Sequence, residues 1–104
     1  MTSRPLEFDP SEYLDSDEMI VEYLSAALSE NDPDLLLAAI STVARSKGMT
    51  ELARSSGLGR ESLFKTLSPG SKPRFETVVR ILRALGVRFS IEPDRSSSVE
   101  KIPA

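Results

Sequence analysis

The sequence contains no cysteine and no histidine among its 104 residues. Without cysteine there is no disulfide framework and no cysteine-based zinc site. Without histidine the usual general base near neutral pH is missing, and no carboxylates or lysines form a recognisable catalytic constellation. We therefore expect a protein that is not an enzyme and that needs neither a metal ion nor a cofactor.

Long apolar runs are also missing. No stretch approaches the roughly 18 apolar residues of a membrane span, and the polar, acidic N-terminus MTSRPLEFDPSEYLDSDEM does not resemble a signal peptide. These absences favour a cytoplasmic protein with no membrane partner. The composition, 39% hydrophobic and 28% charged, is ordinary for one small globular domain.

The net charge of −3 conceals two halves of opposite sign. Residues 1–48 hold three Lys/Arg against ten Asp/Glu, a net of −7, and residues 49–104 hold ten against six, a net of +4. Such asymmetry suggests two different partners, a basic protein surface for the first half and a polyanion for the second. The alternative is that both are only solvated faces.

Helical periodicity and capping signals divide the chain into five expected helices. Asp15 with Glu18 resembles an N-cap pair, Asp32-Pro33 is a strong helix start, and Gly86 is placed to end the last helix. The expected helices span 16–29, 33–47, 49–56, 60–68 and 74–85.

Beyond the last helix, Val87, Phe89 and Ile91 alternate with polar residues, which predicts one short strand. A lone strand leaves unpaired backbone groups, so we expect it to pair with the same strand of a second copy across a two-fold axis. The alternative is a strand that packs only against its own core. The expected fold is therefore all-α, with a five-helix, lambda-repressor-like helix-turn-helix domain and one short C-terminal strand at a dimer interface.

Residues 49–68, MTELARSSGLGRESLFKTLS, fit a helix-turn-helix pattern. Ala53 is small where the two helices would cross, and Gly57 tolerates the positive φ of the turn. The apolar positions that would pack the helices together are Leu52, Leu58 and Leu63. Two positions depart from the pattern, because Ser56 and Thr66 stand where apolar residues are more usual. The alternative is a pair of helices that only pack together.

The second helix of this unit and the loop after it carry the candidate DNA contacts. With Leu63 and Leu67 pointing inward, the outward residues predicted to contact bases are Arg60, Glu61, Ser62 and Lys65. The predicted phosphate contacts are Thr50, Ser68, Ser71, Lys72 and Arg74. From 45 to 83 there are nine Lys/Arg against three acids, so the unit lies in the most basic window of an acidic chain.

The acidic N-terminal segment suits docking on a basic partner, because apolar and aromatic residues stand among its acids. The candidate contacts are Leu6, Phe8, Tyr13, Leu14, Ile20 and Tyr23. The alternative for the helix over 16–29 is that it only covers the core. We expect three parts: 1–30 as the acidic arm and helix, 31–93 as the DNA-binding and dimerisation domain, and 94–104 as a disordered tail.

Four stretches of the sequence together resemble a known family. They are FDPSEYL at 8–14, VEYLSAAL at 21–28, GMTELARSSGLGRESLFKTLS at 48–68 and KPRFETVVRILRALGVRF at 72–89. The chain resembles the helix-turn-helix antidotes of bacterial type II toxin–antitoxin addiction modules, most closely the HigA-like antidotes. The resemblance implies an antitoxin that binds a basic RelE/ParE/HigB-like toxin directly. It also implies a homodimer that binds operator DNA and represses its own operon, with 60–68 as the recognition helix and the N-terminal segment as the toxin-binding element.

Two other functions are compatible with the residues. One is a stand-alone phage- or plasmid-type helix-turn-helix repressor with no toxin partner. The other is an interaction module with no role on DNA.

Overall fold

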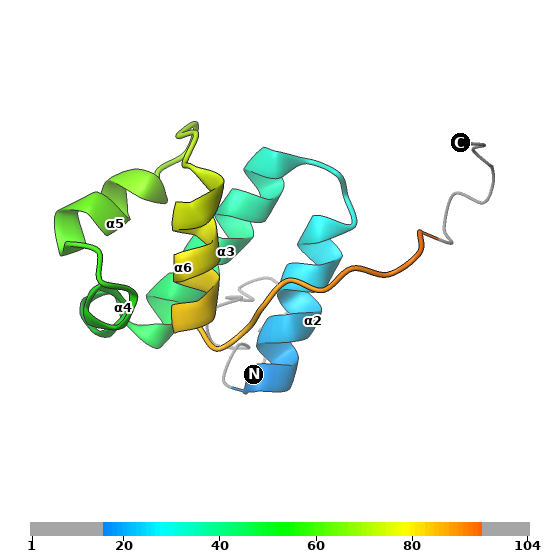
Figure 1. Ribbon diagram of the computed structural model, residues 1–104, viewed down its shortest axis with the longest axis horizontal. Coiled ribbons are helices and arrows are strands. Elements are labelled where there is room, and N and C mark those ends of the chain that lie inside the picture. The colour runs from blue at the N-terminus through cyan, green and yellow to red at the C-terminus, as the bar shows by residue number, and fades with distance from the viewer. Residues whose placement is uncertain (1–15, 95–104) are drawn as a thin grey trace, which may run out of the picture.

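A computed structural model describes residues 16–94, which form five α-helices and no strand. The helices are α2 (Asp17–Leu28), α3 (Pro33–Lys47), α4 (Met49–Ser56), α5 (Arg60–Thr66) and α6 (Phe75–Ala84). In Figure 1, α4 and α5 lie on one side of the molecule, α2 lies on the other, and α6 crosses in front of α3 between them. The all-α prediction and the five predicted helices are confirmed, and no helix within residues 16–94 is long and apolar enough to cross a membrane.

The helix boundaries follow from local capping chemistry. Asp32 caps α3 as predicted, because its carboxylate accepts from the backbone N–H groups of Asp34 and Leu35, with Pro33 in the first turn. For α2 the prediction was wrong by one residue: the cap is Ser16, whose Oγ accepts from the Met19 N–H at 3.2 Å. Side-chain oxygens thus fix the starts of both helices.

The end of α6 is closed by a Schellman motif. The Gly86 N–H donates to the Arg83 carbonyl and the Val87 N–H to the Leu82 carbonyl, each at 3.0 Å. Gly86 has φ +93°, which a residue with a Cβ adopts only with strain. The motif confirms Gly86 as the residue that ends the helix and sets the direction in which the chain leaves it.

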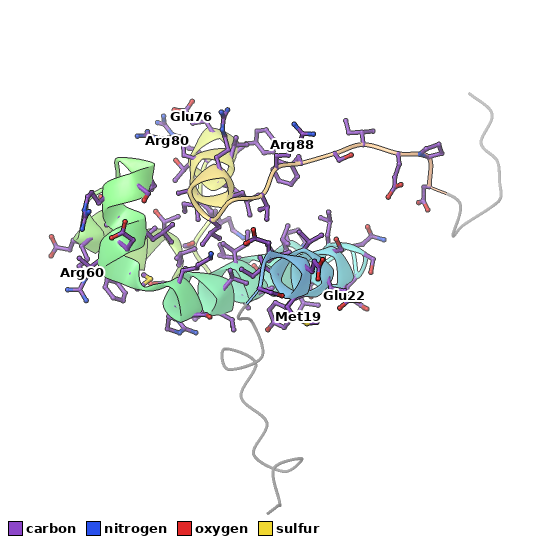
Figure 2. The ribbon with its side chains drawn as sticks, turned by 90° about the horizontal axis from the view of Figure 1, so that it is seen from below. Met19, Glu22, Arg60, Glu76, Arg80 and Arg88 are labelled. Carbon is purple, nitrogen blue, oxygen red and sulfur yellow. The ribbon has the colours of Figure 1, made fainter. Side chains whose placement is uncertain are left out.

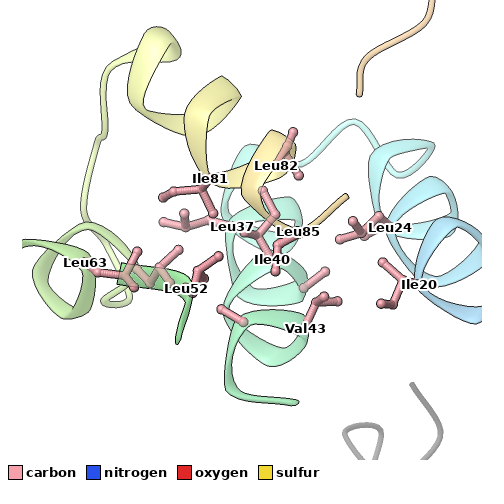
Figure 3. Close-up of a cluster of buried hydrophobic side chains, with 14 of the residues drawn as sticks. Ile20, Leu24, Leu37, Ile40, Val43, Leu52, Leu63, Ile81, Leu82 and Leu85 are labelled. Atoms are coloured by element: carbon pink, nitrogen blue, oxygen red, sulfur yellow. The ribbon is translucent and has the colours of Figure 1, made fainter. Parts of the chain in front are cut away.

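One hydrophobic core joins all five helices (Figure 3). Its largest fully buried side chains are Ile20, Ile40, Leu63, Ile81, Leu85 and Val43. Helix α2 contributes Ile20, Leu24 and Ala27, which are 1%, 8% and 8% exposed, and it packs against α3. The helix that the sequence grouped with the N-terminal arm therefore shares its core with the helices of 31–93.

The predicted C-terminal strand is wrong. Residues 87–94 have no strand, although their apolar and polar residues alternate. Val87 packs on the core, the Phe89 ring stacks on Phe75 with centroids 5.6 Å apart, and Ile91 is 97% exposed. A strand needs a neighbour to receive its backbone hydrogen bonds, and the segment instead lies against its own chain through two side chains.

Candidate nucleic-acid interface

Helices α4 and α5 meet at the predicted helix-turn-helix turn. Gly57 has φ +79° and lies in the left-handed region, as the pattern required. Of the side chains expected to join the helices, Leu52 is 2% exposed, Leu63 is fully buried and Leu58 is half-buried against the core. Leu67 is 6% exposed, so the predicted inward direction of Leu63 and Leu67 is confirmed.

The departure from the pattern at Ser56 has a structural explanation. Ser56 is 7% exposed, and its Oγ donates to the Ala53 carbonyl at 3.4 Å and accepts from the Leu58 N–H at 3.3 Å. The hydroxyl therefore satisfies a backbone group just beyond the end of α4, which an apolar side chain could not do. Thr66, the second departure, is half-buried, and its carbonyl accepts from the Ser71 hydroxyl.

A side chain from α6 fixes the turn from outside the helix-turn-helix. Arg80 donates from Nη2 to the Ser56 carbonyl at 3.1 Å. This carbonyl is at the C-terminus of α4, where the helix carries partial negative charge. A Cβ on Gly57 would lie 2.9 Å from the same Nη2, so the absence of a side chain at position 57 lets the guanidinium approach.

All four predicted base-contacting residues are exposed on α5: Arg60, Glu61, Ser62 and Lys65. Figure 2 places Arg60 at one end of the helical body. Its guanidinium carbon lies 5.2 Å from the centroid of the Phe64 ring, in a cation–π arrangement. Phe64 is itself 44% exposed, so its ring is part of the same surface.

Sequence reasoning missed Phe64 as a member of this surface. The signal was the spacing of four residues between Arg60 and Phe64, which places two side chains on one face of a helix. Because the Arg60 guanidinium lies over the Phe64 ring, the two residues form a contact pair on the exposed face of α5.

The predicted phosphate contacts differ in whether their side-chain donors already form hydrogen bonds within the protein. Within the loop, the Ser68 hydroxyl donates to the Phe64 carbonyl at 2.9 Å and the Ser71 hydroxyl to the Thr66 carbonyl. Both protons are thus used to close the loop after α5. Lys72 and Arg74 are exposed beside them, and Thr50 is exposed in the first turn of α4. Within residues 16–94, Lys72 and Arg74 have no ion-pair partner, so these two cationic side chains of the loop can meet an anion.

The candidate toxin contacts lie away from this surface or outside the described chain. Leu6, Phe8, Tyr13 and Leu14 are outside residues 16–94. Ile20 is 1% exposed and belongs to the core, and Tyr23 is half-buried on α2. Residues 16–44 nevertheless carry six acids and no Lys/Arg, so α2 and most of α3 present an acidic surface.

The described residues contain no group of three or more histidine, cysteine, aspartate or glutamate side chains able to hold a metal ion. The chemistry that the α4–α5 surface does offer consists of exposed guanidinium, ammonium, carboxylate and hydroxyl groups on a helix end and a basic loop. These are the groups that contact base edges and phosphates in DNA complexes.

The comparisons with known proteins identify a family. The profile of a family described as "Probable addiction module antidote protein" matches residues 5–93. An uncharacterised protein of Haemophilus influenzae is 38% identical over 95 residues, which cover 91% of this chain and 98% of that protein. No solved structure matches the chain. An antidote implies a cognate toxin as partner and suggests a non-enzymatic regulatory role. The chain belongs to the family of probable addiction module antidote proteins.

Proposed function

We propose that this antidote is a HigA-like helix-turn-helix antitoxin of the cytoplasm. It neutralises a basic RelE/ParE/HigB-like toxin by direct binding and represses its own operon as a DNA-binding dimer. The observation that carries the proposal is the α4–α5 pair, with its left-handed turn at Gly57, in the basic part of a chain whose α2–α3 surface is acidic.

On DNA, α5 enters the major groove, where Arg60 and Lys65 match guanine acceptors and Glu61 accepts from the cytosine amino group. Lys72 and Arg74 bind phosphates at the groove edge. One such unit neutralises few phosphates and binds weakly at physiological salt, whereas a dimer on two half-sites doubles the contacts.

The toxin binds on the acidic side of the molecule, to α2 and the N-terminal segment that precedes it. A hollow of about 330 Å³ between α2 and α3 includes Tyr23, Glu30 and Leu35 in its lining, and Leu35 is 42% exposed. An apolar floor with an acidic rim suits a basic protein segment that brings an aliphatic or aromatic side chain.

The direct test is a fluorescence anisotropy titration of the full chain against the DNA upstream of its own gene. We expect specific binding that survives about 150 mM salt, since non-specific binding depends mostly on counterion release and fails first. Loss of all preference for that DNA over an unrelated duplex would instead favour an interaction module with no role on DNA.

The stand-alone repressor is the alternative to the antitoxin. Membership in an antidote family favours the antitoxin, because an antidote has a toxin to neutralise. Co-expression with the neighbouring reading frame distinguishes the two. A small basic protein that co-purifies with the chain, and whose toxicity the chain suppresses, supports the antitoxin, and a neighbour without either property supports the repressor.

A further inference from the structure

The surface between α2, α6 and the chain that follows α6 exposes a group of large apolar side chains. Phe75 is 72% exposed, Phe89 is 40% exposed and Val21 is 50% exposed, and Leu28, which shares a hollow with the two rings, is 48% exposed. We call these four residues the Phe75–Phe89 face. Contiguous exposed apolar patches are uncommon on monomers and usually mark an interaction site.

The Phe75–Phe89 face borders two hollows in the protein surface. Two hollows, of about 510 Å³ and 900 Å³, share the stacked rings of Phe75 and Phe89. Leu28 lines the smaller hollow together with the first half of α3 and the 71–73 loop, and Val21 lines the larger together with α6 and the chain that follows it. The stacked rings border both hollows, and a projecting apolar side chain can fill either one.

Charges of opposite sign flank the apolar part. Arg83 and Arg88 line the larger hollow, together with Val21. Val21 also lines a third hollow, together with the acids Asp17, Glu18 and Glu22. Within the described chain none of these five charged side chains has an ion-pair partner, since the ion pair there joins Arg54 to Glu51. Figure 2 shows Glu22 and Arg88 away from the Arg60 end of the body.

We infer that the occupant of the Phe75–Phe89 face is a second copy of this chain, related by a two-fold axis. In an isologous interface each surface meets itself, so the acids that share a hollow with Val21 in one copy meet the two arginines of the other copy. A basic toxin fits the face poorly, because its two hollows are lined by three cations, Lys72, Arg83 and Arg88, against one acid, Asp34. The inference rests on the proposed function in one respect: operator binding, as proposed, requires a dimer, and the Phe75–Phe89 face supplies the interface of that dimer.

The geometry of α6 separates this face from the turn of the helix-turn-helix, although the phosphate candidate Lys72 lines the smaller hollow. Phe75 and Arg80 are five residues apart, which separates their side chains by about 140° around a helix. Phe75 contributes to the face and Arg80 binds the turn of the helix-turn-helix. A dimer formed through Phe75 therefore joins the two copies on a side of α6 that does not contact the α4–α5 turn.

The test is the solution mass of the full chain without DNA or toxin, measured by sedimentation equilibrium from about 1 to 100 µM. We expect a mass of twice 11.4 kDa for the wild type, and at least a tenfold weaker association for Phe75→Ala. Phe64→Ala is the matched control, because Phe64 is an exposed aromatic outside the face, and it should leave the association unchanged. An unchanged circular dichroism spectrum will show that the exposed Phe75 is not needed for folding, whereas the thermal midpoint should fall with the loss of the partner subunit.

Charge exchange tests the two-fold arrangement itself. We expect Arg83→Glu/Arg88→Glu to be monomeric, Glu18→Lys/Glu22→Lys to be monomeric, and the two variants mixed to form a heterodimer. A monomeric wild type, or a dimer that Phe75→Ala leaves intact, would overturn the inference. A monomeric wild type whose toxin binding is lost in Phe75→Ala would assign the face to the toxin and also overturn it. Since no DNA is present, these results are independent of whether the chain binds its operator.

Discussion

Arg80 of α6 donates a hydrogen bond to the carbonyl oxygen of Ser56, 24 residues earlier, at 3.1 Å. The contact joins the helix that carries Phe75 to the turn that orients α5. It also places a positive charge at the C-terminus of α4, where the helix dipole is negative. The orientation of the proposed reading helix thus depends on a residue outside the helix-turn-helix motif.

We expect Arg80→Gln to lower the free energy of unfolding by about 1 kcal/mol, since a charge-assisted hydrogen bond is lost at a helix end. Urea denaturation measures the change. Lys65→Gln removes an exposed cation with no partner in the described chain and should change stability by less than about 0.5 kcal/mol. Equal effects of the two variants would show that the Ser56 contact contributes nothing.

Gly57→Ser should destabilise the fold by about 1 to 2 kcal/mol, because φ is +79° and the new Cβ would lie 2.9 Å from the Arg80 guanidinium. Gly59→Ser is the matched control. A Cβ added at Gly59 would meet nothing within 4 Å, and this residue is the N-cap of α5, where serine is favoured. Thermal unfolding of both variants should therefore give shifts of different size, with Gly59→Ser neutral or stabilising.

On DNA, Lys65→Ala should change which bases are preferred, whereas Lys72→Ala should weaken binding to all sequences alike and reduce the salt slope by about 1. Anisotropy titrations against the operator and its single-base variants separate the two effects. A uniform loss from both variants would mean that α5 does not read the bases.

Phe64→Leu should lower affinity for the operator about two- to fivefold while leaving the fold stable. The ring attracts the Arg60 guanidinium at 5.2 Å, an interaction of about 0.5 to 1 kcal/mol at an exposed site. In Arg60→Ala, the same change at Phe64 should have a much smaller effect, because the partner is already absent. Independent losses in the double variant would show that Phe64 acts without Arg60.

Glu30→Lys should weaken toxin binding about three- to tenfold, with a loss that shrinks as salt rises, because Glu30 lies at the rim of the α2–α3 hollow. Glu92→Lys makes the same change beyond α6 and should leave toxin binding unaltered. Titration calorimetry with the purified toxin measures both. Point substitutions are needed here because deletion of residues 1–30 would remove the buried Ile20 and Leu24.

The sequence predicted those elements whose causes are local. Asp32-Pro33, Gly57 and Gly86 act through their own backbone and nearest neighbours, and each does in the structure what its position indicated. The strand over Val87, Phe89 and Ile91 was predicted from alternation alone. Alternation does not reveal whether a neighbouring strand exists, and the Phe75–Phe89 stack depends on where two distant segments meet.

The candidate site shows the same limit. The exposure of Arg60, Glu61, Ser62 and Lys65 followed from helical geometry once Leu63 was taken as buried. The contact of Arg80 with the turn could not be predicted in this way, because nothing in the spacing of residues 56 and 80 indicates that they meet. The internal bonds of Ser68 and Ser71 were equally hidden, since a serine in a loop can bind a phosphate or its own backbone.

The shared core of α2 and α3 has a consequence for the lifetime of the protein. A protease that cuts within α2 removes Ile20, Leu24 and Ala27 from beneath α3, and the remaining helices lose the apolar cover on one side. With the two activities located as proposed, turnover ends both together: the toxin is released and the operator is vacated by a single proteolytic event. If the chain represses its own operon as proposed, the loss of the repressor also allows the transcription that replenishes the antidote.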